Sequence, residues 1–125
     1  EDVPPHPIIF SKATTSVCGP DDVILGSLDP TESVDYEGEL GVIIGKESFR
    51  VTKSEAMNCV FGYVNINDVT SRELQKKHNQ WLIGKSLNTF CPMGPWILTA
   101  DEVENVGDDA SVESKSILQP HVAQL

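Results

Sequence analysis

Apolar positions along the chain fall into short clusters separated by polar and Gly/Pro-containing segments, a pattern typical of strands rather than long helices. The most apolar cluster gives the strongest prediction, a buried strand over residues 36–45 with an acidic start. Residues 60–66 form a second predicted strand because β-branched and aromatic side chains dominate them. Three shorter apolar runs predict further strands, at residues 8–12, 23–25 and 96–99.

Two polar tetrapeptides have the spacing of a helix-capping box, in which a Ser or Thr lies three residues before a Glu. The segment 52–55 predicts a short helix over residues 53–59, and the segment 70–73 predicts a second helix that reaches His78. Turn and loop residues occupy the segments between these elements, at 19–22, 26–34 and 84–95. Because strands outnumber the short helices, the predicted fold class is β-rich α+β.

The character of the sequence changes after Val103. The remaining residues, 104–125, are polar and acidic and have no clear period, which is typical of a disordered tail. We therefore expect one folded region over residues 1–103, followed by an acidic tail that differs from it.

Composition excludes several classes of partner. A chain of 125 residues is long enough for one small domain with a core. The net charge of −10 repels phosphate backbones and anionic lipids, so neither nucleic acid nor a membrane is an expected partner. The three cysteines lack the CxxC spacing of zinc sites, and reduced thiols fit a cytoplasmic location or, alternatively, the mitochondrial matrix.

The acidic start of the strongest strand raises a chemical question. Glu37 and Glu39 are two residues apart, so in a strand they point to the same side, where like charges repel. Spacing alone favours a solvated strand end. Asp68 changes this balance because it follows the strand 60–66 and precedes the second predicted helix, a corner at which functional groups are often held. Three carboxylates of this kind suit Mg²⁺ or Mn²⁺, which prefer oxygen ligands.

Four other polar side chains are candidates for the same site. Lys85 lies in IGKS, which resembles the end of a phosphate-binding loop, but Asn79 stands where that loop needs a Gly. We therefore expect Lys85 to lie in an ordered loop and to contact a substrate carboxylate or enolate, the alternative being a solvated lysine. Lys12, Arg72 and Gln75 either point toward the carboxylates or into water.

Four segments together resemble the fumarylacetoacetate hydrolase family: PIIFSKATTS, DYEGELGVIIGK, EAMNCVFGYVNINDVTSRELQ and WLIGKSLNTFCPMGPWILTADEV. The resemblance covers residues 7–103 in the family's order and spacing. It implies a mixed β-sandwich roll with short helices, incomplete in this chain, and a homodimer.

The resemblance also implies roles for individual residues. The family's metal ligands fall on Glu37, Glu39 and Asp68, which would bind Mg²⁺ or Mn²⁺, with Ca²⁺ as a further candidate. The family's catalytic lysine falls on Lys85. The resemblance places substrate-binding roles on three other residues: Lys12, Arg72 and Gln75.

The implied activity is that of a hydrolase, decarboxylase or isomerase acting on a 2-oxo acid, such as an acylpyruvate or oxaloacetate, through a metal-stabilised enolate. Two departures support a different hypothesis. The His–Glu pair that activates water in many hydrolytic members has no equivalent here, and residues 104–125 do not resemble the family's closing strands. On this second hypothesis the chain is an inactive remnant of the catalytic domain or an interaction module.

Overall fold

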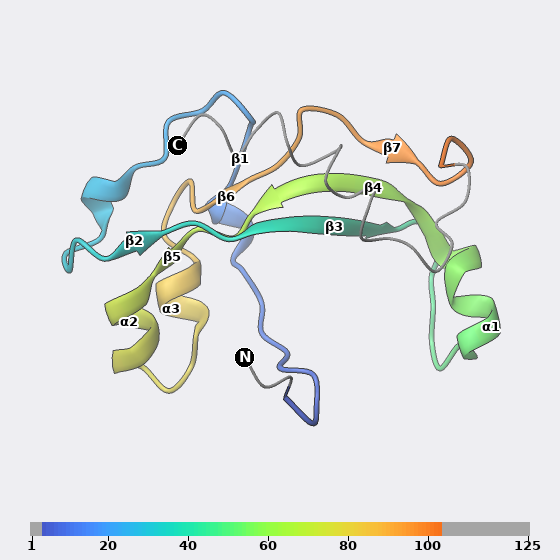
Figure 1. Ribbon diagram of the computed structural model, residues 1–125, viewed down its shortest axis with the longest axis horizontal. Helices are drawn as coiled ribbons and strands as arrows, with labels where there is room; N and C mark the ends of the chain where they lie inside the picture. The colour runs from blue at the N-terminus through green and yellow to red at the C-terminus, as the bar shows by residue number, and fades with distance from the viewer. Residues whose placement is uncertain (1–3, 104–125) are drawn as a thin grey trace. The chain divides into compact units, whose positions relative to one another are not determined.

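The computed structural model describes residues 4–103, so the tail predicted over residues 104–125 lies outside the described residues. The described chain divides into two units, each built from two separate stretches of sequence. Unit 1 contains residues up to 37 and residues 68–92, and unit 2 contains residues 38–67 and those from 93 onward. Figure 1 shows the elements of both units.

A three-stranded antiparallel sheet forms unit 2. Its strands are β3 (Gly38–Ile44), β4 (Val60–Asn67) and β7 (Leu98–Thr99), in the order β3-β4-β7. The pairing of β3 with β4 runs from Gly38 opposite Asn67 to an irregularity between Ile43 and Ile44, and Figure 1 shows the two strands side by side. The two strongest strand predictions are therefore confirmed as strands, and β7 confirms part of the one over 96–99. The expected burial of the first strand is wrong, since Leu40, Val42 and Ile44 of β3 are 41%, 52% and 59% exposed.

The predicted helix in unit 2 is also confirmed, as α1 (Lys53–Ala56) followed by the 3-10 turn η3 (Met57–Cys59). Its capping box is formed as the spacing predicts. The side chain of Thr52 caps the backbone of Glu55, and the Glu55 carboxylate accepts a hydrogen bond from the backbone amide of Thr52. Such reciprocal caps satisfy amide groups that a helix start leaves without intrahelical partners.

Short elements make up unit 1. Two pairs of strands are present, a parallel pair of β1 (Val17–Cys18) with β6 (Cys91–Pro92) and an antiparallel pair of β2 (Val34–Asp35) with β5 (Thr70–Ser71). Two helices follow β5, α2 (Arg72–Lys77) and α3 (Leu82–Lys85). Two 3-10 turns complete the unit, η1 (Thr14–Ser16) and η2 (Gly26–Leu28).

The two helices of unit 1 approach closely at Gly84. A methyl group added there would lie 2.6 Å from the amide nitrogen of Gln75 and 2.9 Å from the carbonyl oxygen of Ser71. Only a residue without a side chain fits that distance, so Gly84 allows α3 to lie against the start of α2. The buried apolar side chains of this unit are Val69, Leu74, Phe90 and Cys91.

Several local predictions are wrong. Residues 8–12 and 23–25 are not strands, and their apolar side chains are largely exposed, Ile9 by 90% and Val23 by 75%. The segment 84–95 is less irregular than expected, since it contains the end of α3 and all of β6. The cap of α2 is Ser71, which accepts a hydrogen bond from the amide of Leu74, so the predicted capping box at 70–73 does not form.

The structure nevertheless confirms the β-rich α+β class, because every described helix has six residues or fewer and most elements are strands. None of the helices among residues 4–103 is long and apolar enough to cross a membrane.

Candidate active site

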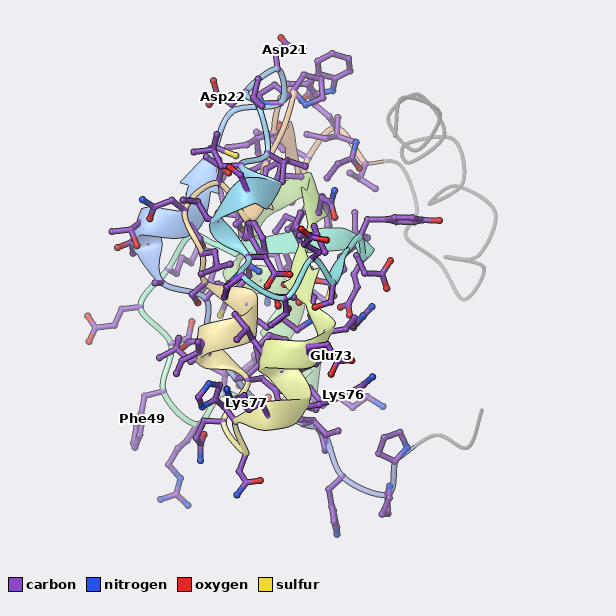
Figure 2. All side chains as sticks on the ribbon, turned by 90° about the vertical axis from the view of Figure 1, so that its left-hand side faces the viewer. Asp21, Asp22, Phe49, Glu73, Lys76 and Lys77 are labelled. Carbon is purple, nitrogen blue, oxygen red and sulfur yellow. The ribbon has the colours of Figure 1, made fainter. Side chains whose placement is uncertain are left out.

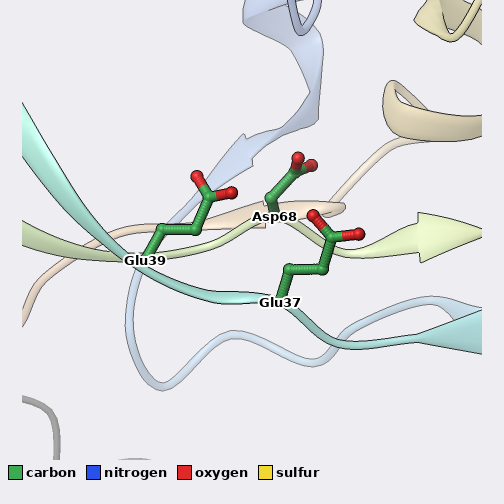
Figure 3. A group of neighbouring side chains, drawn as sticks. All are labelled: Glu37, Glu39 and Asp68. Atoms are coloured by element: carbon green, nitrogen blue, oxygen red, sulfur yellow. The ribbon is translucent and has the colours of Figure 1, made fainter. Parts of the chain in front are cut away.

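The acidic residues predicted from the sequence lie at the ends of strands. Glu37 stands between β2 and β3, and Asp68 stands between β4 and β5. Their backbones are joined by a hydrogen bond of 2.8 Å from the amide of Asp68 to the carbonyl oxygen of Glu37. Glu39 follows two residues later on β3. One carboxylate oxygen of each of the three residues lies within 4.8 Å of the others. Figure 3 shows the three side chains as neighbours.

Lys85 is the last residue of α3, not a loop residue as expected, and it is 1% exposed. Its ammonium nitrogen donates hydrogen bonds to Oε2 of Glu37 at 2.8 Å and to Oδ2 of Asp68 at 2.7 Å. The same nitrogen lies 5.1 Å from the centre of the Phe10 ring, a distance suited to a cation–π contact. A buried ammonium group of this kind is stable only where carboxylates neutralise it.

Lys12 approaches the same aspartate from the N-terminal segment. Its ammonium donates hydrogen bonds to Oδ1 of Asp68 and, at 3.1 Å, to the carbonyl oxygen of Val69. Both oxygens of the Asp68 side chain therefore have a lysine partner. The sequence separation of 56 residues explains why local patterns could not reveal this pairing.

Arg72 begins α2, and its guanidinium contacts two acidic residues. Nη1 lies 2.5 Å from Oε1 of Glu37 and 3.3 Å from Oε1 of Gln75. The other edge of the guanidinium, Nε and Nη2, lies 2.9 and 2.8 Å from Oδ2 of Asp35. Six of the predicted site residues thus form one hydrogen-bonded series in unit 1: Lys12, Asp68, Lys85, Glu37, Arg72 and Gln75.

Hydrogen bonds from these cations change the acidity of their partners. Burial alone would raise the pKa of Glu37, but hydrogen bonds from Lys85 and Arg72 outweigh it, so the pKa lies below its usual value. The pKa of Asp35 is also lowered, mainly by its hydrogen bond with Arg72. Burial works to lower the pKa of Arg72, but hydrogen bonds with Asp35 and Glu37 leave it raised. Both carboxylates are therefore ionised at neutral pH.

The donor set fits a hard divalent cation. Glu37, Glu39 and Asp68 offer only carboxylate oxygens, which are the ligands that Mg²⁺, Mn²⁺ and Ca²⁺ prefer. Glu37, Glu39 and Asp68, together with Asp35, face three cationic side chains, those of Lys12, Lys85 and Arg72, which leaves one net negative charge. A divalent cation added to this set would make it positive, and the site would then attract an anion.

Two contacts of the site were not assigned by sequence reasoning. Asp35 lies two residues before Glu37, so alternation places it on the same side of the strand, but its position at the start of the strand gave it no predicted role. Phe10 carries no such signal, since an apolar residue in a short apolar run predicts only burial. In the structure its ring packs edge-on against Trp81, with the ring centres 5.3 Å apart.

Comparisons with known proteins agree with this picture. A family model for the C-terminal part of fumarylacetoacetate hydrolase matches residues 1–116, so the similarity extends on both sides beyond the stretch 7–103 to which the resemblance was assigned. Oxaloacetate tautomerase YisK of Bacillus subtilis is 46% identical over 103 residues, which are 82% of this chain and 34% of that protein.

Solved structures give the same result. A fumarylacetoacetate hydrolase from Exiguobacterium antarcticum has a TM-score of 0.74 at 49% identity, over 78% of this chain and 35% of that one. A 5-carboxymethyl-2-hydroxymuconate delta-isomerase from Mycobacterium smegmatis has a TM-score of 0.71 at 37% identity, over 80% and 39%. The chain thus spans somewhat more than a third of the length of these proteins.

Proposed function

The chain belongs to the fumarylacetoacetate hydrolase family, and from this premise we propose that it carries the metal- and substrate-binding residues of an enzyme that acts on a 2-oxo acid. The candidate reactions are hydrolysis, decarboxylation or keto–enol tautomerisation of a compound such as an acylpyruvate or oxaloacetate. The names of two relatives, an oxaloacetate tautomerase and a delta-isomerase, favour an enol-forming step on an oxo acid.

The observation that carries this proposal is the environment of Lys85. An ammonium group that is 1% exposed lies between Glu37 and Asp68, which also belong to the three-carboxylate group. Burial of so many charges is costly, and structural cores rarely contain such a group without a functional reason. Lysine and carboxylates arranged in this way suit chemistry in which negative charge develops on oxygen.

Glu37, Glu39 and Asp68 would hold the divalent cation, Mg²⁺ or Mn²⁺, with Ca²⁺ as a further candidate. When bound, such an ion supplies Lewis acidity toward the oxygen atoms of a 2-oxo acid.

The cationic side chains of the chain supply the remaining chemistry. Lys85 would donate a hydrogen bond to the enolate oxygen, where its position in a buried site makes the interaction stronger than it would be in water. Lys12 and Arg72 are more exposed, with 14% and 32% of their side chains accessible, and would bind substrate carboxylates. Gln75 would add a hydrogen bond beside Arg72.

A calorimetric titration of the purified chain with Mn²⁺ tests the metal part of the proposal. We expect saturable binding that Glu37→Gln weakens more than about tenfold, because a charged oxygen ligand is lost. Glu73→Gln is the matched control, since Glu73 is an exposed residue of α2 whose side chain forms an ion pair with Lys76. Figure 2 labels both residues. Equal binding by both variants, or none by the original chain, would contradict the metal assignment.

Ultraviolet absorbance of enol oxaloacetate, with Mn²⁺ present, tests the activity. A rate that is lost in Lys85→Met, in a sample that still shows a cooperative unfolding transition, supports enzyme chemistry, and the product distinguishes tautomerisation from decarboxylation. Metal binding without turnover would instead support the hypothesis of an inactive remnant. The homodimer implied by the family is tested separately by sedimentation equilibrium.

A further inference from the structure

We propose that Asp35 is a positioning residue, which fixes the orientation of the Arg72 guanidinium so that one edge faces the site and can bind a substrate carboxylate. The substrate part of this inference rests on the proposed function. The positioning part does not, since it concerns two side chains of unit 1 whose contacts are independent of any ligand.

Both oxygens of Asp35 are engaged. Oδ1 accepts a hydrogen bond of 2.9 Å from the amide of the next residue, Tyr36. Oδ2 accepts one from Nε of Arg72 at 2.9 Å and lies 2.8 Å from Nη2. The contact with the local backbone holds the carboxylate in one orientation, and the carboxylate in turn holds the Nε–Nη2 edge of the guanidinium.

Because the guanidinium is planar, holding Nε and Nη2 against Asp35 also determines the direction of Nη1. Nη1 faces Oε1 of Glu37 and Oε1 of Gln75, which lie among the predicted site residues. Because guanidinium geometry is rigid, fixing one edge fixes the other, which a flexible lysine side chain would not achieve. Arg72 is therefore directed at the site by a carboxylate that is not one of the three candidate metal ligands.

The backbone of Arg72 is fixed as well. Its amide donates a hydrogen bond of 3.0 Å to the carbonyl oxygen of Ser33, two residues before Asp35. Asp35 itself pairs with Thr70 in the β2–β5 ladder, so both side chains extend from a connected piece of backbone. The ion pair between Asp35 and Arg72 thus joins two side chains whose backbone positions are already fixed by the β2–β5 pairing and by the hydrogen bond to Ser33.

Stability is a poor explanation for this ion pair. The side chains of Asp35 and Arg72 are 45% and 32% exposed, and exposed ion pairs contribute little to the free energy of unfolding. A positioning role makes a different prediction: substrate affinity depends on Asp35, whereas folding and metal affinity do not.

The positioning claim is tested by nuclear magnetic resonance of the Arg72 Nε–H group, without metal. We expect a resolved Hε signal with slow solvent exchange in the original chain, and exchange at least about tenfold faster in Asp35→Asn, because the charge-assisted hydrogen bond is weakened. Asp35→Glu should restore part of the protection. Unchanged exchange in Asp35→Asn would overturn the proposal whatever the activity of the chain.

Calorimetry with oxalate, a probe that resembles the enolate of a 2-oxo acid, tests the consequence for binding. With Mn²⁺ bound, we expect Asp35→Asn to raise the Kd for oxalate about tenfold, as Arg72→Gln does, while the Kd for Mn²⁺ changes by less than about twofold. Glu73→Gln, which removes the same charge one residue from Arg72, should change neither constant.

The outcomes separate this inference from the proposed function. An oxalate Kd in Asp35→Asn equal to that of the original chain would overturn the role of Asp35 in binding, while normal Mn²⁺ binding in the same samples would leave the metal site intact. Failure of the original chain to bind Mn²⁺ would contradict the proposed function, and the exchange measurement would still decide the positioning claim.

Discussion

The two units of the chain differ in what they bury. In unit 1 most of the buried side chains are polar, and they include a lysine and two aspartates: Ser16, Asp29, Asp68, Thr70, Ser71 and Lys85. Among residues 38–67 and 93–103 of unit 2 the buried hydrophobic residue is Val64, and large apolar side chains of the same sheet are exposed, such as Val42 by 52%. Unit 1 therefore depends on satisfied polar networks, and unit 2 depends on the hydrogen-bonded strand ladder.

In unit 1 the structure depends on contacts between buried polar side chains, whereas in unit 2 it depends on backbone pairing between strands. A polar network in a poorly hydrated environment is intolerant of change, because removing one partner leaves another buried and unsatisfied. A strand ladder with one exposed face tolerates side-chain changes there but not changes that separate its backbones. Substitutions in the two units should accordingly differ in kind as well as in size.

The largest effect is expected from Lys85→Met in unit 1. Loss of the ammonium group leaves Glu37 and Asp68 without the partner they share, and breaking a buried ion pair from one side costs about 3–5 kcal/mol. Urea denaturation measures this loss in the free energy of unfolding. Lys76→Met is the control, since that lysine is 71% exposed and should change stability by less than about 0.5 kcal/mol. Similar losses of stability in Lys85→Met and Lys76→Met would mean that the buried polar network does not stabilise unit 1.

The next effect is expected from Gly62→Ala in unit 2. A methyl group at this position would collide with the carbonyl oxygen of Leu98 and lie 3.0 Å from Cγ2 of Ile97, so β4 and β7 would have to separate. We expect a loss of about 2 kcal/mol in the free energy of unfolding, typical of overpacking at a rigid contact.

Gly26→Ala provides the matched control for this change. Its added methyl group would meet only Cγ2 of Val34, at 3.7 Å, which is an ordinary contact. We expect no loss of stability in the same urea experiment. If Gly62→Ala were equally harmless, the short pairing of β7 would not contribute to the stability of unit 2.

The predictability of the two units from sequence follows the same division. Strands β3 and β4 were predictable because their segments are rich in apolar and β-branched side chains, and α1 because its cap is local in sequence. The runs at 8–12 and 23–25 were too short to distinguish a strand from an extended segment. The helix α3 was missed because four residues, one of them Gly84, carry no helical period.

The candidate site was predictable only in part, for a related reason. Spacing identified Glu37 and Glu39, and the position of Asp68 at a strand end identified the third carboxylate. The burial of Lys85 and its two carboxylate partners depend on contacts between residues far apart in the chain, which no local pattern contains. The orientation of Arg72 by Asp35 likewise requires the register of β2 with β5.

A moderate, pH-dependent effect is expected from Asp29 in unit 1. Burial alone would raise its pKa, but hydrogen bonds from Thr31 and Ser33, together with Ser71, lower it to about 2. Because the folded-state pKa lies below the value of about 3.9 in an unfolded chain, the ionised carboxylate stabilises the fold above about pH 4. That contribution is lost as the pH falls toward about 2.

Thermal unfolding of Asp29→Asn at two pH values tests this expectation. At neutral pH the variant should have a Tm lower by about 5 °C, because the hydrogen bonds to a charged acceptor are lost. Near pH 2 the difference from the original chain should largely disappear, since Asp29 is then becoming protonated in both states. A difference that stays constant with pH would mean that ionisation of Asp29 does not contribute to unit 1.

The smallest effect is expected from Val42→Thr on the exposed side of β3. Both residues are β-branched and suit a strand, and Val42 is 52% exposed, so the free energy of unfolding should change by less than about 0.5 kcal/mol. Val64→Thr is the matched change on β4, where the side chain is 5% exposed and a hydroxyl group would be buried, and it should cost about 2 kcal/mol. Equal costs at both positions would mean that the face carrying Val42 is covered in solution. Sedimentation equilibrium on the same samples would then show whether the chain associates with a second copy of itself.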